Sequence, residues 1–320
     1  MDIRKLKKVE LHVHLDGSVK VSTLADIMEI DEDLARKMSV AGDDCKDLND
    51  YLSLFDTPIM IMQTADVLTR VAEDLVDSFI HDNVIYAEVR FAPNKHTINL
   101  SLDEVVDAVL DGLKSEKVKV NLILCMMRGD TFEDNKKIIE LAYKYYDYGV
   151  VGVDLAGAEA IYKTEDYKEL FNYASSLGIP FTIHAGEADG INSINSAVSF
   201  GATRIGHGVR AIENENCMNT LKENDILLEV CPTSNIETKV CSSIRNHPIK
   251  KLFDYGVKVS INTDNRTVSN ITLNDEYELL EKTFHFTERD FNNMNVEAIK
   301  HAFINDIEKL KLINKIRETN

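Results

Sequence analysis

The chain has 320 residues and a formal net charge of −18, because 54 acidic residues outnumber 36 lysines and arginines. Affinity for a nucleic-acid backbone or an anionic membrane surface depends on lysine and arginine, so this balance argues against both as partners. Apolar residues make up 44% of the chain and charged residues 28%, which excludes disorder as its main character and is ordinary for a globular protein.

The five cysteines show no pattern of a secreted or zinc-ribbon protein. Their number is odd and no C-x-x-C motif occurs, so we expect no disulfide framework and a cytoplasmic location. The basic N-terminus is not followed by the apolar segment of a signal peptide. The longest apolar run, Leu122–Met127, is far too short to span a membrane.

Eight short segments rich in valine, isoleucine and leucine recur along the chain and predict strands buried on both faces. They span Val9–Leu15, Val84–Arg90, Lys119–Met127, Val150–Leu155, Pro180–His184, Thr203–Gly206, Ile226–Val230 and Val257–Asn262. Stretches with helical periodicity lie between them, such as Val67–His81 and Leu102–Leu113. Ser101 and Glu104 have the spacing of a capping box at the start of the second helix.

Strand and helix alternate eight times, which predicts an α/β fold of the (β/α)8 TIM-barrel class, with a doubly wound open sheet as the alternative. Two pieces lie outside the repeat: a helical insertion at residues 20–66 after the first strand, and helices over residues 276–320. There is no linker, internal repeat or low-complexity tract, so we expect a single domain over residues 1–320.

One helix of the insertion carries apolar residues with helical spacing: Leu48, Tyr51, Leu52 and Phe55. This pattern is consistent with a lid over a binding pocket and equally with plain packing of an amphipathic helix.

In a barrel of this class the active site lies at the carboxyl ends of the strands. The polar residues predicted at these ends are His12, His14 and Asp16 after the first strand, His184 and Glu187 after the fifth, His207 after the sixth, and Asp264 and Asn265 after the eighth. Four of the nine histidines therefore fall on one predicted rim.

Successive side chains of a strand point to opposite faces, so His12 and His14 share a face. A pair of this kind is a weak signal alone, but His184 and Asp264 at other strand ends strengthen it. Zinc accepts histidine nitrogen and carboxylate oxygen, and a catalytic site leaves one position open for water. The alternative for His184 is a histidine bonded to a neighbouring carbonyl, and for Asp264 a turn or N-cap residue.

Two further residues are candidates for proton transfer. Glu187 follows His184 by three residues and could donate or accept a proton at the mouth of the site. The alternative is a glutamate in the first turn of a helix. His207 lies between two glycines, where it could orient a metal-bound water or simply occupy a turn.

Six motifs together resemble the adenosine deaminase family, and the resemblance covers essentially the whole chain. They are H-V-H-L-D-G at 12–17, D-L-A-G-A-E at 154–159, I-H-A-G-E at 183–187, R-I-G-H-G at 204–208, C-P-T-S-N at 231–235 and N-T-D-N at 262–265. Single motifs are shared with other amidohydrolases, whereas the set, in this order, is specific. The resemblance implies hydrolytic deamination of adenosine, and of 2′-deoxyadenosine, to inosine and ammonia in purine salvage.

The same resemblance implies a role for each site residue. His12, His14, His184 and Asp264 would bind one zinc ion. Glu187 would protonate purine N1, and His207 would hold and orient the attacking hydroxide. Asp16 and the face of His14 would meet the ribose, the Gly157 backbone amide would bond N3, and Asn265 would meet N7.

The motif around Asn265 departs from the animal enzymes, which carry a second aspartate there. An asparagine amide can donate to N7 without a protonated carboxyl, and Asn265 followed by Arg266 resembles the bacterial enzymes. Other zinc deaminases carry a P-C-x-x-C motif, which is absent here.

Three alternatives stay open at this point. An adenine deaminase would act on the free base, although Asp16 and the insertion favour a ribose. A catalytically inactive, zinc-stabilised binding protein would have the same fold. A site of three histidines and one aspartate could also take Co²⁺ or Fe²⁺. A nucleotide deaminase is disfavoured because no lysine and arginine cluster lies beside the motifs, so a small-molecule nucleoside is the expected partner. The sequence carries no signal for the oligomeric state.

Overall fold

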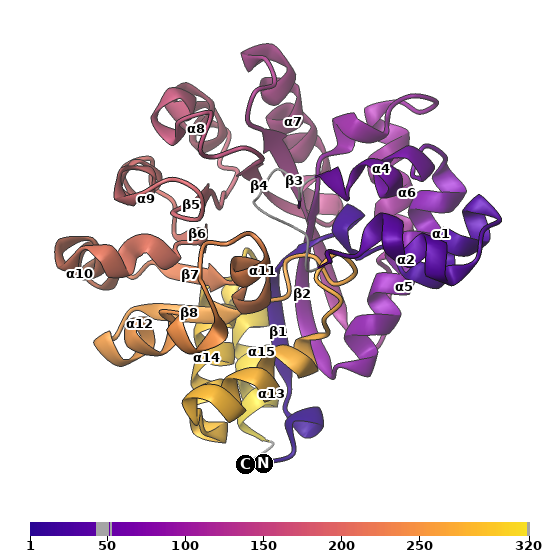
Figure 1. Ribbon diagram of the computed structural model, residues 1–320. Helices are drawn as coiled ribbons and strands as arrows, with labels where there is room; N and C mark the ends of the chain where they lie inside the picture. Colours follow the sequence, from indigo (N-terminus) through magenta and orange to yellow (C-terminus); the bar gives the residue numbers. More distant parts are fainter. Residues whose placement is uncertain (43–50, 52, 319–320) are drawn as a thin grey trace.

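The computed structural model describes residues 1–42, 51 and 53–318. Eight parallel strands form the centre of this part of the chain, and helices surround them (Figure 1). The strands are β1 (Lys8–His14), β2 (Val84–Phe91), β3 (Lys119–Met127), β4 (Val150–Ala156), β5 (His184–Ala185), β6 (Arg204–His207), β7 (Leu227–Val230) and β8 (Lys258–Ile261). Each predicted strand segment contains or overlaps one of them.

The strands pair in chain order as two parallel sheets, β1 to β4 and β5 to β8. Parallel bridges join the sheets at both junctions, between Val13 and Asp264 and between Val153 and Phe181. The strands therefore follow one another around a ring, which confirms the TIM-barrel prediction against the open doubly wound sheet.

The fifth strand is shorter than the sequence predicts. Only His184–Ala185 pairs regularly with β6, whereas the prediction covered Pro180–His184. Pro180 has no N–H to donate, and its carbonyl accepts from the Val153 amide instead. The chain before His184 makes an isolated bridge to β4 at Phe181, and the Ile183 carbonyl accepts from the Gly206 amide of β6.

Helices of three groups cover the strands. The insertion contains α1 (Val21–Met28), α2 (Glu32–Ser39) and α4 (Asp56–Ile61), which lie on one side of the barrel near α5 and α6 (Figure 1). The barrel helices are α5 (Ala65–His81), α6 (Leu102–Gly112), α7 (Phe132–Tyr145), α8 (Lys168–Ser176), α9 (Ile191–Ser199), α10 (Glu215–Glu223), α11 (Pro232–Glu237) and α12 (Ile249–Tyr255). The C-terminal helices are α13 (Leu273–Phe284), α14 (Glu288–His301) and α15 (Asp306–Arg317).

Local capping explains several helix boundaries. Ser101 and Glu104 form the predicted capping box of α6. A second box, between Thr272 and Asp275, starts α13 at Leu273, three residues before the predicted start of the C-terminal helices. Side-chain acceptors at the N-cap satisfy amide groups that have no partner within the helix.

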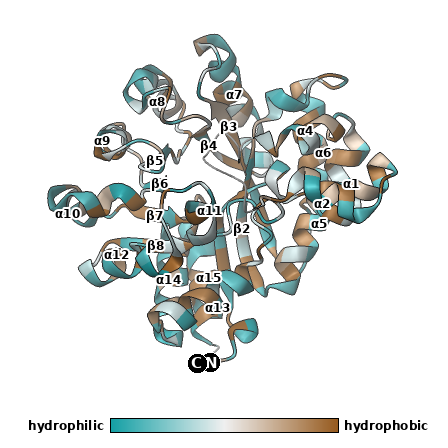
Figure 2. Ribbon diagram, in the orientation of Figure 1, coloured by the Kyte–Doolittle hydropathy of each residue, from teal (hydrophilic) through white to brown (hydrophobic). Residues whose placement is uncertain are grey.

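The helices carry both hydrophobic and hydrophilic residues (Figure 2), and their buried apolar residues, such as Leu68, Val71 and Leu75 of α5, belong to the core. One large apolar cluster fills the space between helices and barrel wall. Among the described residues, none of the helices combines the length and apolarity that crossing a bilayer would require. The four described cysteines are buried and unpaired.

Candidate active site

A cavity of about 220 Å³ lies at the carboxyl ends of the strands. Eight of the nine predicted site residues line it: His14, Asp16, Gly157, His184, Glu187, His207, Asp264 and Asn265. The ninth, His12, is completely buried beside them. The structure therefore brings all nine residues together, although they come from five different strand ends.

Three histidines and one aspartate converge at the base of the cavity. Asp264 Oδ1 lies 3.4 Å from Nε2 of both His12 and His14, and Nε2 of His14 lies 3.3 Å from Nε2 of His184. One potential ligand atom from each of the four residues lies within 4.8 Å of the others. His12 Nε2 is buried and has no hydrogen-bond partner, which is unusual unless such an atom serves a further ligand.

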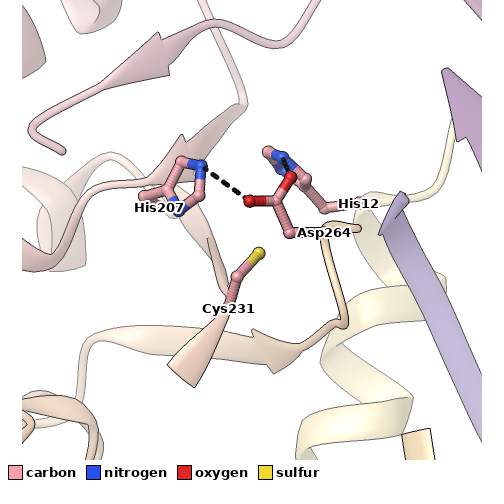
Figure 3. Close-up of side chains that lie close together, drawn as sticks. All are labelled: His12, His207, Cys231 and Asp264. Atoms are coloured by element: carbon pink, nitrogen blue, oxygen red, sulfur yellow. Dashed lines mark ion pairs between the residues drawn. The ribbon is translucent and has the colours of Figure 1, made fainter. Parts of the chain in front are cut away.

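A second group of four donors overlaps the first. His12 and Asp264 also lie close to His207 and Cys231 (Figure 3). Burial raises the pKa of the Cys231 thiol well above its usual range, so this group offers a protonated sulfur. Because a metal ligand must be deprotonated, Cys231 is a poorer donor than a neutral imidazole.

Two buried carboxylates orient the histidine rings from behind. Glu229 Oε2 lies 2.9 Å from His12 Nδ1, and Asp154 Oδ2 lies 2.9 Å from His184 Nδ1. The His12–Glu229 contact is a hydrogen bond, whereas the Asp154–His184 contact is an ion pair without hydrogen-bond geometry; both carboxylates lie on the Nδ1 side of the ring, away from Nε2. Such outer partners fix the orientation and raise the basicity of histidine ligands.

The Arg90 guanidinium joins these two carboxylates. Its Nη1 lies 2.8 Å from Asp154 Oδ2, and its Nη2 lies 2.8 Å from Glu229 Oε2, so it contacts the same two oxygen atoms that hold the histidines. Arg204 contacts the other oxygen of Glu229 at 2.8 Å. Although burial opposes ionisation, Arg90 and Arg204 hold the pKa of Glu229 well below its usual range.

Glu187 is buried at the edge of the cavity. Burial, followed by the charge of Asp264, raises the pKa of its carboxyl group to about 8. The Thr238 hydroxyl donates to Glu187 Oε1 at 3.3 Å. The raised pKa favours the protonated form of the carboxyl group, which can act as an acid.

The backbone around Glu187 is held by a residue to which the sequence analysis gave no role. The buried Glu159 carboxylate accepts hydrogen bonds from four consecutive amides, those of residues 186–189, at 2.7–3.1 Å. It also accepts from the Ser193 hydroxyl at 2.5 Å. These five donors match an ionised carboxylate, which is an acceptor only.

His207 faces Glu187 and Asp264 through Nε2, at 3.6 Å from Glu187 Oε2 and 4.0 Å from Asp264 Oδ2. Its φ of 60° lies in the left-handed region, which residues other than glycine rarely adopt. A Cβ on Gly206 beside it would lie 3.0 Å from the His12 ring, so the ring would have to shift to accommodate a larger residue there. The glycines on both sides of His207 therefore permit the close approach of strand ends.

Asp16 follows β1 and Asn265 follows β8, two strands that are neighbours in the ring. Glu187 follows β5, four strands away from β1 in the strand order. Burial raises the pKa of Asp16 to about 6. A Cβ at Gly17 would lie 2.0 Å from Asn265 Oδ1, so only glycine allows the two segments this contact. Of the predicted apolar helix residues, Leu48 and Leu52 lie outside the described residues, whereas Tyr51 and Phe55 line the cavity.

The parallel barrel and the polar cluster at the carboxyl ends of its strands are those of an amidohydrolase-type enzyme. Solved structures agree: an adenine deaminase from Arthrobacter aurescens has a TM-score of 0.86 at 23% identity, covering 98% of both chains. An Arabidopsis N6-mAMP deaminase has a TM-score of 0.89 at 28% identity, covering 99% of both chains.

Sequence comparison identifies the family within this class of enzymes. The family model described as adenosine deaminase matches residues 7–319. The adenosine deaminase of Enterococcus faecalis is 40% identical over 325 residues, which is 98% of this chain and 96% of that protein. The chain belongs to the adenosine deaminase family.

Proposed function

We propose that this enzyme catalyses the zinc-dependent hydrolytic deamination of adenosine to inosine and ammonia. The observation that carries the proposal is the convergence of three histidines and Asp264 in one buried cavity, beside Glu187, whose pKa burial raises. Membership of the family and the named relatives support the same reaction.

One zinc ion would be held by His12, His14, His184 and Asp264. Imidazole nitrogen and carboxylate oxygen suit this metal, and the orphaned His12 Nε2 is explained by a ligand at this position. When bound, the ion supplies a Lewis acid that brings the pKa of a water molecule towards neutrality. We favour this set over the one that contains Cys231 because His14 and His184 line the cavity, whereas the Cys231 thiol donates to the Glu229 carbonyl.

The side chains around the purine would carry the proton movements. Glu187 gives its proton to N1, which makes C6 electrophilic, and His207 orients the water whose oxygen bonds to C6. The water gives up one proton as it attacks, which restores the Glu187 carboxyl group. The remaining proton of the new C6 hydroxyl then moves to N6, the C6–N6 bond breaks, and ammonia leaves with inosine as the other product. Asn265 would contact N7, and the Gly157 amide would contact N3.

The cavity suits a nucleoside better than a nucleotide. Asp16 and the His14 ring would contact the ribose. Lys95 is the only lysine or arginine in the described part of the cavity wall. Its Nζ lies 3.2 Å from Asp130 Oδ1, so its charge is already paired. Asp56 also lines the cavity, so a 5′-phosphate would meet one neutralised cation and an acidic side chain.

The decisive experiment measures ammonia release from adenosine, adenine and AMP at equal concentration, with protein of known zinc content. We expect turnover of adenosine and little turnover of the other two. Preference for adenine would overturn the ribose contacts of Asp16, and preference for AMP would overturn the argument from Lys95. Bound zinc without turnover of any of the three would contradict the proposed activity.

A further inference from the structure

A chain of buried hydrogen bonds leads from a helix N-terminus to the His207 ring. The backbone N–H of Ile249, the first residue of α12, donates to His247 Nδ1 at 3.2 Å. His247 Nε2 lies 3.2 Å from Asn235 Oδ1, and Asn235 Nδ2 lies 3.0 Å from His207 Nδ1. His247, Asn235 and His207 are all at most 2% exposed, so water does not compete for these bonds.

The direction of every bond in the chain follows from its first member. A backbone N–H can only donate, so His247 Nδ1 must be an acceptor without a proton. The neutral ring then carries its proton on Nε2 and donates to Asn235, whose facing atom must be the amide oxygen. Burial lowers the pKa of His247 to about 4, in agreement with a neutral ring at physiological pH.

The remaining atom of the Asn235 amide is an NH₂ group, which donates to His207 Nδ1. The neutral His207 ring must therefore carry its own proton on Nε2. That nitrogen is the one that faces Asp264 Oδ2 (Figure 3), and it also lies 3.6 Å from Glu187 Oε2. The ring thus presents an N–H donor to the reacting groups.

We infer that Asn235 and His247 are positioning residues that fix the His207 ring as its Nε2–H tautomer, so that it donates to the oxygen of the attacking water. This inference rests on the proposed role of His207. Neither residue contacts the substrate in this proposal, because each acts through the next ring or amide in the chain.

The amide of Asn235 is what sets the tautomer, and Asn235→Asp reverses it without changing the shape of the side chain. A carboxylate only accepts, so His207 Nδ1 must then carry the proton and the neutral ring presents a lone pair at Nε2. A catalytic histidine held in the wrong tautomer loses about 10⁴-fold in kcat in a serine protease of intact geometry. We expect a fall in kcat of about 10²–10⁴-fold here.

Nitrogen NMR of the zinc-loaded enzyme labelled with ¹⁵N at histidine tests the tautomer directly. The His207 signals are assigned by their loss in His207→Ala. We expect a proton on Nε2 in the native enzyme and on Nδ1 in Asn235→Asp, where kcat is measured at a pH at which the same spectra show a neutral ring. Asn246→Asp is the matched control, because the same change at this exposed neighbour should alter neither spectrum nor kcat.

A second variant covers the case that Asn235→Asp does not fold. His247→Phe keeps the ring volume but removes the donor to Asn235, so both tautomers of His207 should be populated and kcat should fall by a smaller factor. A native His207 with its proton on Nδ1, or native kcat in Asn235→Asp, would overturn the inference. Native kcat in His207→Ala would instead overturn the proposed role of His207.

Discussion

Two fully buried glutamates, Glu229 of β7 and Glu276 of α13, should respond in opposite ways to the same isosteric change. Glu229 is ionised and contacts Arg90 and Arg204, whereas burial raises the pKa of Glu276 to about 8 and keeps its carboxyl group protonated at neutral pH. We predict that Glu229→Gln destabilises the protein and that Glu276→Gln does not.

The magnitude follows from the contacts of Glu229. Removing one partner of a buried ion pair costs about 3–5 kcal/mol. Arg90 keeps Asp154 and Arg204 keeps Glu88 as partners, which favours the lower end, about 3 kcal/mol. An unfolding entropy of about 2.1 cal/mol/K per residue over 320 residues then gives a fall in Tm of about 4–5 °C.

Thermal unfolding at pH 7 in the presence of a chelator measures this difference without a contribution from bound metal. Glu276→Gln keeps the acceptor for the Thr233 amide and should not lower Tm, because native Glu276 must stay protonated at pH 7 against its ordinary pKa of 4.5 and a glutamine need not. In a separate competition experiment, Glu229→Gln should bind zinc about 10–100-fold more weakly, because His12 loses its orienting carboxylate. Equal Tm values for the two variants would refute the electrostatic reasoning.

Three further predictions follow from single residues. The neutral Glu276 contributes stability that is fully present below its ordinary pKa of 4.5 and is lost as pH rises through about 8. Glu276→Gln should therefore gain stability relative to the native protein as pH rises between these values, which thermal melts at a series of pH values would measure. A stability difference that does not change with pH would contradict the raised pKa. Glu187→Gln should retain zinc, measured by metal analysis, but lose about 10²–10⁴-fold in kcat, and near-native turnover would remove Glu187 as the acid. Glu159→Gln turns one acceptor of the four amides at 186–189 into a donor, so kcat should fall by less than in Glu187→Gln. Unchanged kcat in a folded variant would show that these hydrogen bonds of Glu159 serve the fold alone.

Most of the fold could be predicted from the sequence because its elements depend on local patterns. Apolar runs locate the strands, and capping residues such as Ser101 locate helix starts. The error at Pro180–His184 has a local cause as well, since proline within the run removes a donor that regular pairing needs. Closure of the ring through Val13 and Asp264 depends on contacts between the two ends of the fold, which periodicity does not report.

The candidate site residues could be found because they stand at strand ends, where barrel topology concentrates chemistry. The residues that support them could not be assigned in the same way. Arg90 and Glu229 are charged residues within apolar strands, which signals an unusual environment but not which partner each one meets. Asn235 and Glu159 belong to motifs that the sequence analysis quoted, yet their partners lie in other segments of the chain.

The junction between β1 and β8 makes the active centre a late product of chain synthesis. The amide of Asp264 donates to the His12 carbonyl, and the amide of His14 donates to the Asp264 carbonyl, so the proposed ligands themselves form the join between first and last strands. A growing chain exposes its N-terminal part first. His12 and His14 cannot be joined by Asp264 until nearly the whole polypeptide has been synthesised. An N-terminal fragment that ends before residue 264 contains these histidines but not the complete set of proposed ligands.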